Sequence, residues 1–111
     1  MTGEMLSGTM DELDLIERHI LMLNATKENQ PVGIIRLSEL TGIPKHKVRY
    51  SLRLLERDGL IVATPDGAMV TDGYDAFMKD ISERLVTVVD RVNEIRERIA
   101  EDTHADTDGN K

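Results

Sequence analysis

The last third of the chain carries an unbroken heptad pattern of apolar residues, which constrains the fold more than any other feature. Their spacing alternates between four and three positions, as in a helix that buries one seam against a partner. The seam consists of Tyr74, Met78, Ile81, Leu85, Val88, Val92, Ile95 and Ile99. A helix of about 26 residues is about 39 Å long, more than a small domain covers alone. We therefore expect residues 73–100 to form a C-terminal dimerisation helix.

The sequence predicts that the helix has a partner, but it leaves several arrangements of the dimer open. A chain that folds the helix back on its own core explains Tyr74 and Ile81 but not Ile95 or Ile99. Every second seam residue from Ile81 onward is β-branched, which does not favour two parallel strands. A bundle that pairs the basic flank of this helix with the acidic face of the first helix is a further possibility. The basic flank is Arg84, Arg91 and Arg98, and the acidic face is Asp11, Asp14 and Glu17.

The preceding residues predict an α+β domain, mostly α, over residues 10–72. Thr9 and Glu12 have the spacing of a capping box, and we predict a helix from about Met10 to Lys27. A short strand over 32–36 and a short helix over 38–41 follow, with Gly42 in position to end that helix. Pro44 fits the first turn of the next helix, which we expect to run to about residue 58 and to end at Gly59.

A hairpin is predicted directly after this helix. Residues 60–63 and 68–71 are β-type runs, and Thr64-Pro-Asp-Gly67 between them has turn chemistry. Two helices joined by a tight turn and followed by a hairpin have the order of a winged helix-turn-helix. Residues 37–61, LSELTGIPKHKVRYSLRLLERDGLI, resemble winged-helix transcription regulators of the MarR and ArsR kind, especially small archaeal ones. The resemblance implies that helix 44–58 enters the DNA major groove.

The residues of helix 44–58 support the same interpretation. Val48, Leu52 and Leu55 form a buried stripe at about 100° per residue. The remaining surface is basic and hydrogen-bonding: Lys45, His46, Lys47, Arg49, Tyr50, Arg53 and Arg57. Four of these cations are spaced by four positions and repel one another, which an anionic partner would offset. Ser38 is a further candidate phosphate donor, although its hydroxyl is also placed to cap the short helix.

Other features of the sequence oppose DNA binding. The chain has 21 acidic and 14 basic residues, a net charge of -7, which disfavours a polyanionic partner. The hairpin turn has no Lys or Arg and contains Asp66, so we expect little affinity from it. The basic face could also be a solvated surface or bind an acidic protein. The leading prediction is a dimeric DNA-binding transcription regulator; the alternative is a winged-helix protein-interaction module.

The composition excludes several kinds of chemistry. The chain contains no cysteine, which excludes disulfides and thiolate metal sites. His19, His46 and His104 have no metal-ligand spacing, and we expect each to be a surface residue. Neither a phosphate loop nor a nucleophile elbow is present. We expect a soluble, cytoplasmic protein that is not an enzyme and has no cofactor. We also expect a flexible segment 1–9 and a disordered acidic tail 101–111. Whether the protein binds an effector ligand is left open.

Overall fold

The computed structural model describes residues 2–109, with side chains from Glu4 to Thr103. The chain divides into two compact units, residues 1–77 and residues 78–111. The architecture is α+β and mostly helical, with one two-stranded antiparallel sheet. No helix in the described part of the chain has the length and apolar character needed to cross a membrane.

The first unit begins with two helices, α1 (Thr2–Met5) and α2 (Ser7–Asn29). The described residues within the predicted flexible segment 1–9 are largely helical. The hydroxyl of Ser7 donates to the carbonyl of Glu4 at 3.0 Å and links the two helices. Thr9 lies inside α2, so the predicted capping box at Thr9 and Glu12 does not begin the helix; Leu6 is the N-cap residue, with no side-chain cap.

The predicted strand over 32–36 is wrong. Helix α3 (Ile34–Thr41) occupies most of it, and Val32 alone pairs with the hairpin. Its amide donates to the Ala68 carbonyl at 3.1 Å, and the Ala68 amide donates back at 2.8 Å. Gly33 is the extended N-cap of α3, and Leu37 is fully buried three residues into the helix. Burial of Leu37 on a helical face outweighs the local β preference of the Ile pair.

Helix α4 (Lys45–Arg57) matches the predicted helix 44–58 within one residue at each end. Gly42 ends α3 with a φ of 74°, as predicted, and its amide donates to the Ser38 carbonyl at 2.9 Å. At the end of α4, Gly59 has a φ of 77°. Its amide donates to the Glu56 carbonyl, and the Leu60 amide donates to the Leu55 carbonyl. These two bonds form a Schellman motif.

The predicted hairpin is confirmed as β1 (Ile61–Thr64) and β2 (Gly67–Val70), paired from Ile61 with Val70 to Thr64 with Gly67. Gly67 has a φ of 134°, and a Cβ there would lie 2.6 Å from the Val32 backbone nitrogen. Only glycine therefore allows Val32 to approach the hairpin turn so closely.

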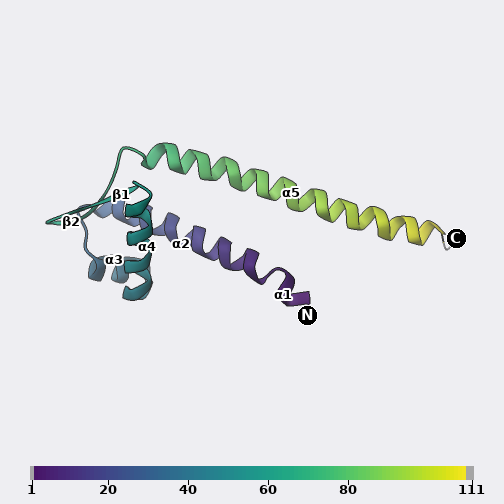
Figure 1. Cartoon of the computed structure of the whole chain (residues 1–111), viewed down its shortest axis with the longest axis horizontal. Helices are drawn as coiled ribbons and strands as arrows, with labels where there is room; N and C mark the ends of the chain where they lie inside the picture. Colours follow the sequence, from purple (N-terminus) through teal and green to yellow (C-terminus); the bar gives the residue numbers. More distant parts are fainter. Residues whose placement is uncertain (1, 110–111) are drawn as a thin grey trace. The chain divides into compact units, whose positions relative to one another are not determined.

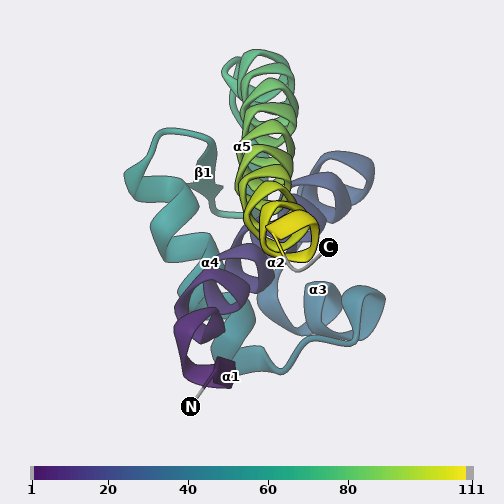
Figure 2. The same cartoon turned by 90° about the vertical axis from the view of Figure 1, so that its right-hand side faces the viewer.

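The core of the first unit lies between α2, α3, α4 and the hairpin. Helices α2, α3 and α4 contact one another, while β1 contacts α4 and β2 contacts α2 (Figure 1; Figure 2). The buried apolar side chains are Met22, Leu23, Val32, Leu37, Val48, Leu55, Leu60 and Ile61. This core holds the N-terminal part of α4 against α2 and α3 and its C-terminal part against β1.

Helix α5 (Tyr74–Gly109) begins in the first unit and forms the described part of the second. Its first turn is held to the end of α2 by Lys27, whose Nζ lies 4.3 Å from the Tyr74 ring centroid and 3.5 Å from Asp75 Oδ1. The helix continues past the predicted end at Ala100 to Gly109, into the segment predicted to be a disordered tail. No Pro or Gly interrupts the sequence between Gly73 and Gly109, and such a stretch gives a helix no stop signal.

Candidate nucleic-acid interface

Helix α4 is anchored by a buried face that differs in one residue from the predicted stripe. Val48 and Leu55 are buried as predicted, whereas Leu52 is half-buried and Ser51 is fully buried in its place. The Ser51 hydroxyl oxygen accepts a hydrogen bond from Nε of Arg18 on α2 at 3.2 Å. A buried hydroxyl is tolerated because it has this partner. The sequence offered no local sign of it, since Arg18 lies 33 positions away.

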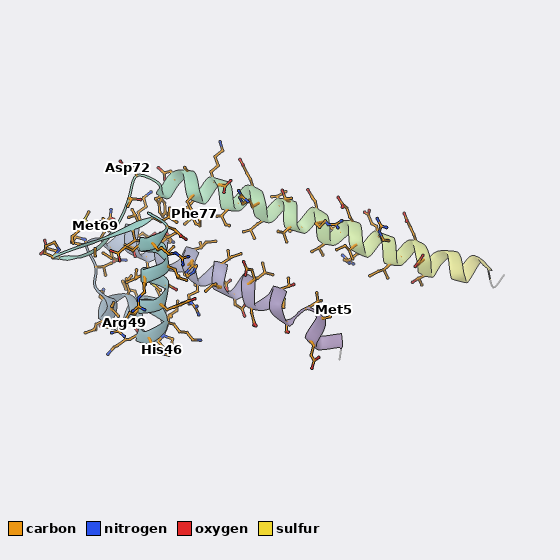
Figure 3. The ribbon with its side chains drawn as sticks, viewed as in Figure 1. Met5, His46, Arg49, Met69, Asp72 and Phe77 are labelled. Carbon is orange, nitrogen blue, oxygen red and sulfur yellow. The ribbon has the colours of Figure 1, made fainter. Side chains whose placement is uncertain are left out.

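The opposite face of α4 carries the predicted contact residues, and every one of them on this helix is exposed. They are Lys45, His46, Lys47, Arg49, Tyr50, Arg53 and Arg57. Tyr50 leaves 48% of its surface accessible. Figure 3 shows His46 and Arg49 in the first half of α4, the end that follows the turn from α3. The structure thus exposes all seven residues on α4, with Lys45 and Lys47 on different flanks of the helix.

Ser38 does not belong to this surface. Its hydroxyl donates to the carbonyl of Ile43 at 2.6 Å and closes the turn between α3 and α4. A hydroxyl has one proton to donate, so the predicted phosphate contact by Ser38 conflicts with this bond. The alternative of an N-terminal cap is also wrong, because α3 begins at Ile34. Thr41 supports the same turn, accepting from the Ile43 amide at 3.2 Å.

The cations of α4 are largely uncompensated within the chain. Arg57 lies 3.4 Å from Asp58, and both side chains are exposed. Among the described side chains, no ion pair includes Lys45, Lys47, Arg49 or Arg53. Glu56, which the sequence places near Arg53, is not within ion-pair distance of it. The helix therefore presents a surface of positive charge although the whole chain is acidic.

Grooves on the two flanks of α4 differ in charge. On the α3 side, Lys45 and Arg49 line an open groove with Arg36 and Glu39. On the α2 side, Lys47 lines a groove with Asp14, Glu17 and Arg18.

Arg36 was not among the predicted contact residues. The predicted strand assigned it no helical face, and recognising Gly33 as a helix N-cap would have placed it on α3, beside α4.

The groove between α4 and the hairpin has an apolar floor with charged residues among its lining. Its volume is about 240 Å³, and Leu52, Ile61 and Ala63 contribute apolar lining together with Arg49 and Arg53. The hairpin turn itself contains Pro65 and Asp66, both exposed. Its Thr64 hydroxyl donates to the Gly67 carbonyl at 2.7 Å and tightens the turn. The turn adds no positive charge to the surface of α4.

The structure corrects the prediction that His19 is a surface residue. His19 is half-buried, and its Nδ1 has no hydrogen-bond partner among the described residues. Burial lowers the pKa of His19 below its ordinary value of 6.5, and the charge of Arg18 lowers it further, whereas Asp58 acts in the opposite direction. His46 is exposed, and the side chain of His104 lies outside those described. No cluster of three metal-binding side chains occurs in the described part of the chain.

The predicted seam is half-buried over its first residues and exposed over its last ones. Tyr74 lies in the first unit, where its ring faces Lys27. Met78, Ile81 and Leu85 are half-buried. Val88, Val92, Ile95 and Ile99 are exposed, by 43% to 61%. Val86 and Val89 widen this apolar face and are more than half exposed. The second unit, taken by itself, has no other described element to cover it.

Comparison with known proteins adds no family to these observations. The chain matches no protein-family model, and a search of curated proteins finds no similar sequence.

Proposed function

We propose that this chain is a dimeric, sequence-specific DNA-binding transcription regulator of the winged helix-turn-helix kind, which inserts α4 into the major groove. The observation that carries the proposal is the exposed basic face of α4, whose central cations have no ion-pair partner among the described side chains. An α-helix fits the major groove of B-DNA, where its side chains reach base edges. The order of two helices, a tight turn and a hairpin supports the same function.

Different residues of α4 suit different parts of the duplex. The guanidinium groups of Arg49 and Arg53 can donate two parallel hydrogen bonds to a guanine edge or contact phosphates. Tyr50 can contact a phosphate through its hydroxyl or a thymine methyl through its ring. Binding at a promoter would then exclude or recruit the transcription machinery.

Dimerisation through α5 is the second part of the proposal. The seam exposes branched apolar side chains over several turns, and burying such side chains is the main favourable term in association. A second copy of the chain offers an identical seam. Two copies would present two α4 helices to half-sites about 34 Å apart, one turn of duplex.

Duplex DNA binding over a range of salt concentrations tests the proposal. Each neutralised phosphate contributes about -0.9 to the slope of log K against log salt. Arg49→Ala with Arg53→Ala should lose the binding while the dimer stays intact in sedimentation. Lys79→Ala with Arg96→Ala is the matched control, because it removes the same charge from exposed positions on α5. Equal losses in both variants would show that net charge, and not α4, governs binding.

The alternative is a winged-helix module that binds an acidic protein through α4. The net charge of -7 and Asp66 in the hairpin turn favour it. Absence of DNA affinity at every salt concentration would reject the DNA-binding proposal in favour of this one.

A further inference from the structure

Cations from two helices line the groove between α3 and α4. Arg36 comes from α3, and Lys45 and Arg49 come from successive turns of α4. The groove is open, with a volume of about 610 Å³, and all three side chains are exposed. None of the three forms an ion pair with any described side chain.

One carboxylate lines the same groove. Glu39 is exposed and is not within ion-pair distance of Arg36, Lys45 or Arg49. Three positive charges and one negative charge leave the groove with an excess of two positive charges. Like charges on neighbouring helices repel one another, and an anion placed between them removes that repulsion.

The opposite flank of α4 lacks this excess. There Lys47 and Arg18 line a groove together with Asp14 and Glu17, so two cations face two carboxylates. From the sequence alone, Lys45 and Lys47 are counted in one basic surface of this helix. The fold separates them, since Lys45 joins Arg36 and Lys47 joins the acidic residues of α2.

We infer that the α3–α4 groove is a phosphate-binding site, with Arg36 as a ligand that acts beside Lys45 and Arg49. The inference rests on the proposed function in taking the phosphate to be one of the DNA backbone. Guanidinium groups bind phosphate oxygens through two parallel hydrogen bonds, and a lysine binds them as a point charge. With α4 in the major groove, such a contact fixes the position of the helix without reading a base.

Single substitutions on the two flanks test the site in DNA binding. Arg36→Gln should lower affinity and reduce the magnitude of the slope of log K against log salt by about 0.9 for each protomer bound. Glu39→Gln should raise affinity. Lys47→Gln removes the same charge as Arg36→Gln but should change the slope less. Wild-type affinity and slope in Arg36→Gln, or an equal change in Lys47→Gln, would overturn the inference while leaving the proposed function standing.

A titration of the full chain with inorganic pyrophosphate, followed by amide NMR shifts, separates the two proposals. We expect shifts in residues 33–36 and 45–49 of the wild type and their loss in Arg36→Gln, with thermal unfolding confirming that the variant folds. These shifts without any DNA affinity would reject the proposed function and identify a free phosphate compound as the ligand. Absence of shifts, together with unaltered DNA binding in Arg36→Gln, would reject the site.

Discussion

The two units differ in where their apolar side chains find cover. In residues 1–77, the side chains of Met22, Leu23 and Leu37 are fully buried against other elements of the same unit. In residues 78–111, the described structure is part of one helix, and its apolar side chains are half-buried or exposed. Because apolar burial is the main favourable term in folding, the first unit has an internal source of stability. The second needs a surface outside itself, and we expect that surface to be a second chain.

The largest expected effect is on the first unit. Leu37→Ala should lower the free energy of unfolding by about 2–5 kcal/mol, the range for deleting a fully buried leucine. Leu40→Ala, on the same helix, is the matched control, because Leu40 is 40% exposed and should cost much less. Thermal or denaturant unfolding at several protein concentrations measures both. Equal costs in the two variants would contradict a core centred on Leu37.

The seam is tested by charges placed along it. Val92→Asp with Ile99→Asp should weaken the dimer about a hundredfold or more, since burial of each such side chain contributes about 1.5–3 kcal/mol. Sedimentation equilibrium should then give the monomer mass. Thr87→Asp with Asn93→Asp adds the same charge off the seam and should leave the dimer intact. A wild-type chain that sediments as a monomer would contradict the expectation that a second chain covers the apolar side chains of the second unit.

Residues whose conformation depends on their neighbours in the sequence were predictable. Residues whose role depends on a partner from another helix were not. Gly42, Gly59 and the turn at Gly67 were predicted because each meets a backbone requirement of its own neighbourhood. The strand over 32–36 failed because β-branched residues favour extension locally, whereas the burial of Leu37 favours a helix.

The candidate site divides in the same way. The exposed face of α4 followed from helical periodicity alone. Ser51 and Arg36 depend on partners from other helices: Arg18 donates to the Ser51 hydroxyl, and Arg36 joins Lys45 and Arg49 only because α3 packs on α4. Neither relation has a sequence spacing that would reveal it.

A smaller effect distinguishes a bundle from a simple pair of α5 helices. Arg91→Glu with Arg98→Glu should weaken the dimer roughly tenfold or less, because exposed ion pairs contribute about 0.2–1 kcal/mol each. Arg91 also lies 3.2 Å from Glu94 of the same helix, a pair that requires no partner chain. Adding Asp11→Lys and Asp14→Lys should restore association if the partner of the arginines is α2. Sedimentation of the double and quadruple variants measures this, and a dimer unaffected by the double reversal would count against the bundle.

The smallest expected effect is a pH dependence confined to the first unit. Burial lowers the pKa of His19 below 6.5, so the unfolded chain binds a proton there more readily than the folded chain does. The contribution of neutral His19 to the free energy of unfolding is therefore fully present above pH 6.5. It is lost as the pH falls from 6.5 through the lowered pKa of the folded state. His19→Gln should remove this decline, and His46→Gln, at an exposed position, is the control. Thermal unfolding at pH 8 and pH 5 compares the variants with the wild type. An identical pH dependence in wild type and His19→Gln would show that burial of His19 does not couple protonation to the packing of α2.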